Sequence, residues 1–216
     1  MKILMGEYAP DEGEILLEGQ VHTISNPSVA LALGISKVHQ ELSPVRDMTV
    51  ADNIFLGREM KKAGFVESRK QVEKAKELFA NLGLSIDPNI LMRDLSVAET
   101  QMVEIAKAVS FNCKILILDE PTTAITSVEI AKLFEIVRLL RKKGVGIVYI
   151  SHKLEELYEI SDRITVLRDS SKILTDDIKN VPHILLVLCM STPVFLPLNM
   201  GISLTMPEKA LSSMFL

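Results

Sequence analysis

Two adjacent carboxylates, Asp119 and Glu120, follow a run of aliphatic residues at positions 115–118. Such a run is typical of a strand that is buried on both faces of a parallel sheet. Because a buried, unpartnered carboxylate is costly, the pair favours a bound cation with a phosphate ligand, at the sheet edge where α/β folds bind ligands. Asp119 would then lie towards Mg²⁺, and Glu120 would polarise an attacking water. The alternative is a strand end whose acids reach solvent or cap the next helix.

Other polar residues lie at the ends of predicted elements. His152 follows a second predicted buried strand, residues 145–150, and Gln40 follows the strand predicted at residues 35–39. Ser96 and Glu99 have the spacing of a capping box, and a capped helix N-terminus is also an anion site. Each has an ordinary alternative. Gln40 could be a surface turn residue, His152 a structural histidine, and Ser96 a cap that contributes about 1 kcal/mol without any phosphate.

The elements that position these residues alternate between strands and helices, which predicts an α/β fold with a mostly parallel sheet. Residues 1–5, followed by Gly6, have the pattern of the end of a helix. Strands are expected at residues 13–19, 35–39, 114–118, 145–150 and 163–167. Helices are expected at residues 28–33, 49–56, 67–82, 96–111, 126–143 and 153–160.

The composition agrees with one globular domain, or one and a half, in 216 residues. A net charge of -4 and a pI near 5.7 argue against nonspecific binding to nucleic acid or anionic membrane. The two cysteines, Cys113 and Cys189, cannot form a disulfide framework, so a reducing compartment is expected.

The mean hydropathy of +0.26 is high for a chain with 24% charged residues. Part of the excess comes from residues 181–216, whose only charges are Glu208 and Lys209. Prolines, Asn199 and Gly201 interrupt this stretch, which favours an irregular or loosely packed tail over a membrane-spanning helix.

In combination the motifs resemble those of the ATP-binding cassette (ABC) ATPases, and they follow that family's order within residues 1–169. VHQE (38–41) resembles the Q-loop, LSVAETQ (95–101) the signature motif, ILILDEPT (115–122) the Walker B motif, TAIT (123–126) the D-loop, and YISHK (149–153) the segment of the switch histidine. The resemblance implies a P-loop NTPase-like cassette with a helical signature subdomain at about residues 60–112.

The resemblance also implies roles for the candidate residues, with ATP and Mg²⁺ as cofactors. Gln40 would contact Mg²⁺ and the attacking water, Asp119 would lie towards the metal, and His152 would contact the γ-phosphate. Glu120 would polarise the water. Gln40, Glu120 and His152 are therefore the candidate catalytic residues, and Asp119 and Gln40 are the candidate metal contacts.

The signature segment Ser96, Val97, Ala98 and Glu99 would bind nucleotide held by a second cassette. Most members of the family have glycines where this chain has Val97 and Ala98. A valine hinders the close approach of backbone to phosphate that glycine permits, so we expect a weaker contact.

Longer segments of the sequence resemble the first cassette of bacterial monosaccharide importers for ribose, xylose, arabinose and galactose or methyl-galactoside. The segments concerned are VHQEL (38–42), NIFLGRE (53–59), LSVAETQMVEIAKA (95–108) and YISHKLEEL (149–157). This resemblance implies an ATPase coupled to sugar import, peripheral on the cytoplasmic face of the plasma membrane. The implied partners are membrane permease subunits, a second cassette and, indirectly, a periplasmic sugar-binding protein; no nucleic acid is implied.

One motif of the family is absent, because the sequence contains no phosphate-binding loop of the form G-x-x-x-x-G-K-[ST]. We therefore expect residues 1–169 to be an incomplete cassette that begins just after this loop, and residues 170–216 to be an apolar tail foreign to the family. The missing strand would lie inside the sheet and leave its neighbours with unpaired edges. Weak or absent ATP binding is expected for the chain alone.

The same sequence is also compatible with other interpretations. The chain could be a non-catalytic module that docks on a permease or on an intact cassette, or a non-functional gene fragment. A DNA-repair ATPase with a similar signature motif is a further alternative. The acidic pI and the segments that resemble those of sugar importers both argue against it.

Overall fold

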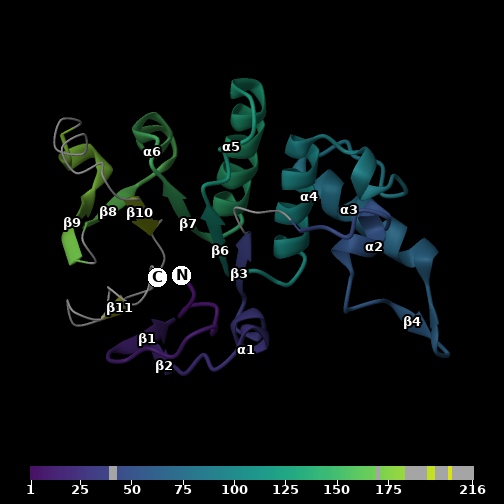
Figure 1. Cartoon of the computed structure of the whole chain (residues 1–216), viewed down its shortest axis with the longest axis horizontal. Coiled ribbons are helices and arrows are strands. Elements are labelled where there is room, and N and C mark those ends of the chain that lie inside the picture. Colours follow the sequence, from purple (N-terminus) through teal and green to yellow (C-terminus); the bar gives the residue numbers. More distant parts are fainter. Residues whose placement is uncertain (39–42, 169–170, 183–193, 198–203, 206–216) are drawn as a thin grey trace.

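The computed structural model describes residues 1–38, 43–168, 171–182, 194–197 and 204–205 (Figure 1). Its largest sheet has six strands in the order β3-β6-β7-β10-β8-β9. The strands are β3 (Ile35–Val38), β6 (Ile115–Asp119), β7 (Gly146–Ser151), β10 (Val194–Pro197), β8 (Arg163–Arg168) and β9 (Ser171–Asp177).

Strands β3, β6 and β7 are parallel, as the apolar sequence of β6 and the alternation of strands and helices predict. Residue Ile115 of β6 is in register with Ile35 on one side and with Gly146 on the other. Because parallel strands end on the same side, the polar residues that follow β6 and β7 leave the sheet at one edge, the edge at which β3 also ends. This arrangement confirms the predicted α/β class.

Strand β10 lies between β7 and β8 and is antiparallel to both. Phe195 is in register with Ile150 on one side and with Thr165 on the other. We had expected the neighbours of a missing strand to have unpaired edges. That expectation is wrong for β7 and β8, since backbone far along the chain pairs with both.

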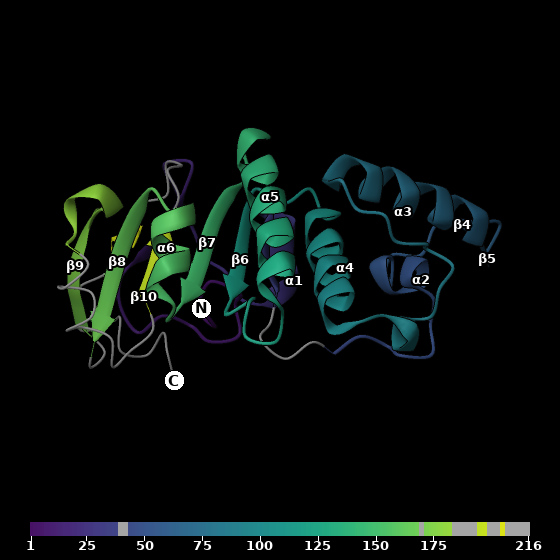
Figure 2. The same ribbon diagram turned by 90° about the horizontal axis from the view of Figure 1, so that it is seen from above.

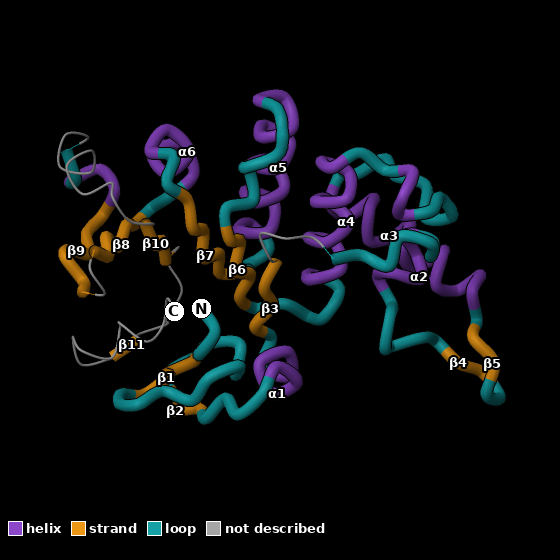
Figure 3. Tube along the Cα trace, viewed as in Figure 1, coloured by secondary structure: helices purple, strands orange, loops and turns teal. Residues whose placement is uncertain are grey.

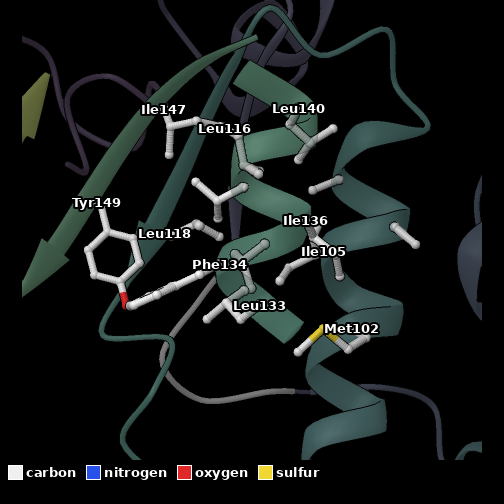
Figure 4. Close-up of a cluster of buried hydrophobic side chains, with 14 of the residues drawn as sticks. Met102, Ile105, Leu116, Leu118, Leu133, Phe134, Ile136, Leu140, Ile147 and Tyr149 are labelled. Carbon is white, nitrogen blue, oxygen red and sulfur yellow. The ribbon is translucent and has the colours of Figure 1, made fainter. Parts of the chain in front are cut away.

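Helices α4 (Val97–Val109), α5 (Ser127–Lys142) and α6 (Leu154–Ile160) lie side by side along one face of the sheet (Figure 2). Figure 4 shows how side chains of α4 and α5 meet those of the strands. The labelled residues of this cluster are Met102, Ile105, Leu116, Leu118, Leu133, Phe134, Ile136, Leu140, Ile147 and Tyr149. Phe134 and Tyr149 contact edge to face, with ring centroids 6.2 Å apart.

The opposite face is covered by the N-terminal segment, by α1 (Pro27–Ala32) and by β1 (Glu14–Leu17), which pairs with β2 (Gln20–His22) and with β11 (Leu204–Thr205) (Figure 1). Residues 1–5 form hydrogen-bonded turns, where we had expected the end of a helix.

Gly6 follows these turns with φ +69°. A Cβ at this position would come within 2.7 Å of the Asn26 backbone. The glycine therefore permits both the left-handed turn and the close approach of the two chain segments.

A largely helical region lies beyond one end of the sheet (Figure 3). It comprises α2 (Val50–Ile54), the short hairpin of β4 (Lys61–Lys62) and β5 (Phe65–Val66), α3 (Ser68–Leu82), η1 (Met92–Asp94) and α4. Ala75, Phe79 and Leu82 of α3 are buried, as their helical spacing predicts. Because α2 also packs against α3 and α4, this region begins before the predicted boundary near residue 60.

Regular structure continues beyond residue 169, into the segment that we expect to be foreign to the family. Strand β9 pairs antiparallel with β8, and the short helix η2 (Ile178–Asn180) follows it. None of the helices that the structure describes is long and apolar enough to cross a membrane.

Candidate functional site

An ion pair lies at the carboxyl edge of the sheet, where the Nζ atom of Lys37 is 3.0 Å from Oδ2 of Asp119. The Lys37 side chain is 10% exposed and that of Asp119 is 26% exposed. Strand alternation places Lys37 on the same face as Ile35, and Asp119 on the same face as Ile117. Sequence reasoning missed Lys37, although a lysine in an otherwise apolar strand could have indicated an acidic partner on the neighbouring strand.

The α-amino group of Met1 belongs to the same surroundings. Burial and, after it, the positive charge of Lys37 lower its pKa to about 6, whereas the charge of Asp119 acts in the opposite direction. The edge of the sheet therefore holds the Lys37 ammonium and the Met1 amine near one carboxylate, on the face that the N-terminal segment covers.

Glu120 and His152 are in contact, with 3.1 Å between Glu120 Oε1 and His152 Nδ1. Glu120 has φ +45°, which is uncommon for a residue other than glycine. Its backbone N–H donates to the carbonyl of Ile150 at 3.0 Å, which fixes the residue against β7. Strained backbone of this kind is concentrated at functional sites. The structure thus brings together two predicted catalytic residues that are 32 positions apart.

Thr123 supports Glu120 from the segment that we compared with the D-loop. Its hydroxyl donates to the backbone carbonyl of Glu120 at 3.1 Å and lies 3.4 Å from the carboxylate Oε2. The Glu120 carboxylate therefore has a neighbour on each side, His152 at Oε1 and Thr123 at Oε2, while its side chain stays 23% exposed.

The predicted capping box at the start of α4 is present. The Ser96 hydroxyl accepts from the Glu99 N–H at 3.2 Å, and the Glu99 carboxylate accepts from the Ser96 N–H at 2.9 Å. Ser96, Val97 and Glu99 are exposed, whereas Ala98 is buried. The N-terminus of α4 thus presents Ser96 and Val97 to solvent.

A hollow of about 410 Å³ lies between the start of α4 and the loop after β6. Val97, Thr100 and Gln101 line one side, and Glu120 and Thr123 line another. The remaining lining residues are Ser43, Pro44, Arg46, Met92, Arg93, Leu95, Pro121, Ala124 and Ile125. The signature segment and Glu120 therefore border the same space, whereas Gln40 lies outside the described residues.

The donor set at the sheet edge fits Mg²⁺ only when phosphate or water completes the shell. Asp119 supplies carboxylate oxygen, the ligand type that Mg²⁺ prefers, and the ion usually binds one or two carboxylates together with substrate phosphates. Among the described residues no cluster of three or more metal-binding side chains occurs. The site thus has the chemistry for a cation carried by a nucleotide.

Comparison with known proteins connects this geometry to a family. Residues 1–123, more than half of the chain, match the ABC transporter family. The chain belongs to that family. Solved ATP-binding cassettes of ABC transporters confirm the fold: a nucleotide-free cassette has a TM-score of 0.71 at 24% identity, covering 83% of this chain and 77% of that one. A cassette in its ADP conformation has a TM-score of 0.72 at 23% identity, covering 87% and 81%.

Curated relatives of this ABC chain are import proteins. One from Halalkalibacterium halodurans, named for ribose, galactose or methyl galactoside import and ATP binding, is 52% identical over 183 residues, which is 84% of this chain and 35% of the relative. The galactose/methyl galactoside import ATP-binding protein of Treponema denticola is 49% identical over 81% of this chain and 35% of its own length. The ABC chain thus spans about a third of the length of these relatives.

Proposed function

We propose that the ABC chain carries the hydrolytic residues of a cassette in a bacterial monosaccharide importer. The contact between Glu120 and His152 at the carboxyl edge of the sheet is the observation that carries this proposal. The identity of about 50% to sugar-import proteins supports the substrate class, and ribose or galactose is the kind of sugar that their names indicate.

Within this proposal, Glu120 orients the attacking water and accepts its proton as the water oxygen attacks the terminal phosphorus of ATP, while the bond from this phosphorus to the bridging oxygen breaks and ADP leaves with that oxygen. His152 holds the Glu120 carboxylate through Nδ1 and presents the rest of its ring to solvent, where the γ-phosphate would lie. The strained backbone at Glu120 fixes the carboxylate before the substrate arrives, which reduces the reorganisation needed in the transition state.

The cation would be held by Asp119 and, in line with the family resemblance, by Gln40. A bound Mg²⁺ would neutralise charge on the phosphate oxygens. Lys37 already neutralises Asp119 in the described structure, so it would have to give way in part or share the carboxylate with the cation.

Ser96, Val97, Ala98 and Glu99 would face nucleotide held by a second cassette. The exposed N-terminus of α4 supports this role because its N–H groups can receive an anion. The partners in this proposal are a second cassette, permease subunits and, through them, a periplasmic sugar-binding protein, with the cassette at the cytoplasmic face of the plasma membrane.

The 216-residue chain alone should bind ATP weakly. A phosphate-binding loop supplies several charge-assisted hydrogen bonds of roughly 1.5–3 kcal/mol each. Their loss exceeds the ~8 kcal/mol that a micromolar dissociation constant represents, even if the contributions are not additive.

A chimera tests the hydrolytic role. Residues 1–168 of this chain would replace the matching residues of the Halalkalibacterium halodurans relative, whose name describes an ATP-binding protein. We expect ATP hydrolysis that falls at least about 100-fold in Glu120→Gln, because a general base typically contributes that much. The matched control Glu155→Gln, at an exposed position on α6, should keep the rate. A chimera that binds ATP but hydrolyses it equally well with Glu120→Gln would overturn the proposal.

A further inference from the structure

A buried carboxylate lies behind the candidate site, in the segment 149–157, and has been given no role so far. Glu156, in the first turn of α6, is 6% exposed. Its oxygens accept from the hydroxyls of Thr122 at 2.7 Å and Tyr149 at 2.8 Å, and Ser151 Oγ lies at 3.3 Å. The ammonium of Lys153 is 3.2 Å from Oε1. The charge is therefore surrounded by three hydroxyl donors and one cation.

This set of contacts is costly to bury unless every member is satisfied. Burial, followed by the negative charge of Glu156, raises the pKa of Tyr149, so this hydroxyl remains a donor. The Tyr149 ring is fixed against Phe134 in the core below (Figure 4). Glu156, which belongs to α6, thus contacts a side chain of β7 that is held in place by packing in the core.

The contacts of Glu156 join two loops that are distant in sequence. Thr122 lies in the loop after β6, two residues beyond Glu120, whereas His152 is flanked by Ser151, the last residue of β7, and by Lys153. Lys153 strengthens the link, because its Nζ also donates to the backbone carbonyl of Thr122 at 3.1 Å. Each loop therefore carries one member of the Glu120–His152 contact and one or more partners of Glu156.

We propose that Glu156 is a positioning residue that locks the loop of Glu120 to the loop of His152 and so sets the contact between these two side chains. It acts from behind the site, without touching substrate. Its importance for catalysis rests on the proposed function, but the geometric role does not, and it can be measured without nucleotide.

A purely stabilising role would leave the contact itself unchanged. Removal of Glu156 would then lower the free energy of unfolding, while His152 would still sense the charge of Glu120. A positioning role predicts instead that His152 no longer responds to the charge of Glu120, because Thr122 and Lys153 no longer share an acceptor. The two roles therefore differ in how one loop responds to a substitution in the other.

The test is an NMR double-substitution cycle on the full chain with ¹³C-labelled histidine. The chain has four histidines, and His152→Gln assigns the signal. Glu120→Gln should displace the His152 signal in the otherwise unchanged chain. In the Glu156→Ala background that displacement should fall by at least about half, because the coupling between the contacting residues is lost.

Glu156→Gln keeps one acceptor oxygen and the shape of the side chain, so the His152 signal should show an intermediate displacement in this background. If Glu156→Ala does not fold, the Glu156→Gln variant tests the positioning role by itself. The control Glu155→Gln, next to it on α6 but exposed, should retain the full displacement. An equal displacement in the unchanged, Glu156→Ala and Glu156→Gln backgrounds would overturn the proposal. So would a His152 signal that never responds to Glu120→Gln. Either result is independent of whether the chimera hydrolyses ATP.

Discussion

The start of α4 and the carboxyl edge of the sheet both border the hollow between them, yet they are built in different ways. At the start of α4 the polar contacts are local, because Ser96 and Glu99 cap each other within one turn. At the sheet edge Glu120 contacts His152, which is 32 residues away, and Asp119 contacts Lys37 on another strand.

The comparison distinguishes polar contacts that one segment forms by itself from polar contacts that require several elements of the fold to become neighbours. A capped helix N-terminus is formed by its own sequence and is ready for an anion from outside. The sheet edge depends on the register of the strands and on the loops that follow them. Substitutions should therefore have larger effects on stability in the strands that form the edge than at the helix cap.

The largest effect is expected for Leu118→Ala, directly before Asp119 on β6. Leu118 is fully buried in the cluster between the sheet and the helices. Loss of its side chain should lower the free energy of unfolding by about 2–5 kcal/mol, as measured by urea denaturation. Val128→Ala, on the exposed side of α5, is the control and should change it by less than about 0.5 kcal/mol. Similar changes in the free energy of unfolding for the two variants would contradict the view that the sheet edge depends on the packing of its strands.

A smaller effect is expected for Asp119→Asn. The substitution leaves Lys37, which is largely buried, without its anion, so the loss should be roughly 1–3 kcal/mol. Lys114→Met removes a comparable but exposed pair with Glu18 and should cost less than about 1 kcal/mol. Additive effects of Asp119→Asn and Lys37→Met in a double-mutant cycle would show that the pair does not contribute.

The Met1 amine should make stability depend on pH. Its pKa is lowered to about 6 in the folded chain, so between pH 6 and 8 the unfolded chain binds more protons. The free energy of unfolding should therefore rise with pH across this window, by about 2 kcal/mol from this group. Urea denaturation at pH 5.5 and 8.5, with an N-terminally acetylated chain as the control, isolates the contribution. An equal pH dependence in both chains would refute it.

The smallest effect is expected at the helix cap. Ser96→Ala should lower the free energy of unfolding by about 1 kcal/mol, and Ser96→Gly by only a few tenths. Thermal denaturation of both variants, measured side by side, checks the order. A loss at Ser96 as large as that at Leu118 would mean that α4 depends on more than its local cap.

The contrast also explains which features the sequence could predict. The strand β6, the Ser96–Glu99 box and the buried face of α3 depend on local patterns, and all were predicted. Lys37, Glu156 and the pairing of β10 depend on which elements become neighbours, and local patterns carry no such information. Glu120 and His152 were selected as candidates by motif, but only the fold places them in contact.

We propose that the 216 residues hold the hydrolytic residues of an ABC cassette but no phosphate-binding loop, and ATP binding distinguishes this arrangement most directly. Isothermal titration calorimetry with MgATP tests this proposal on the 216-residue chain and on the chimera with the Halalkalibacterium halodurans relative, which is named as an ATP-binding protein. We predict no saturable binding in the micromolar range for the chain, and binding near micromolar for the chimera. A micromolar dissociation constant for the chain itself would contradict the claim.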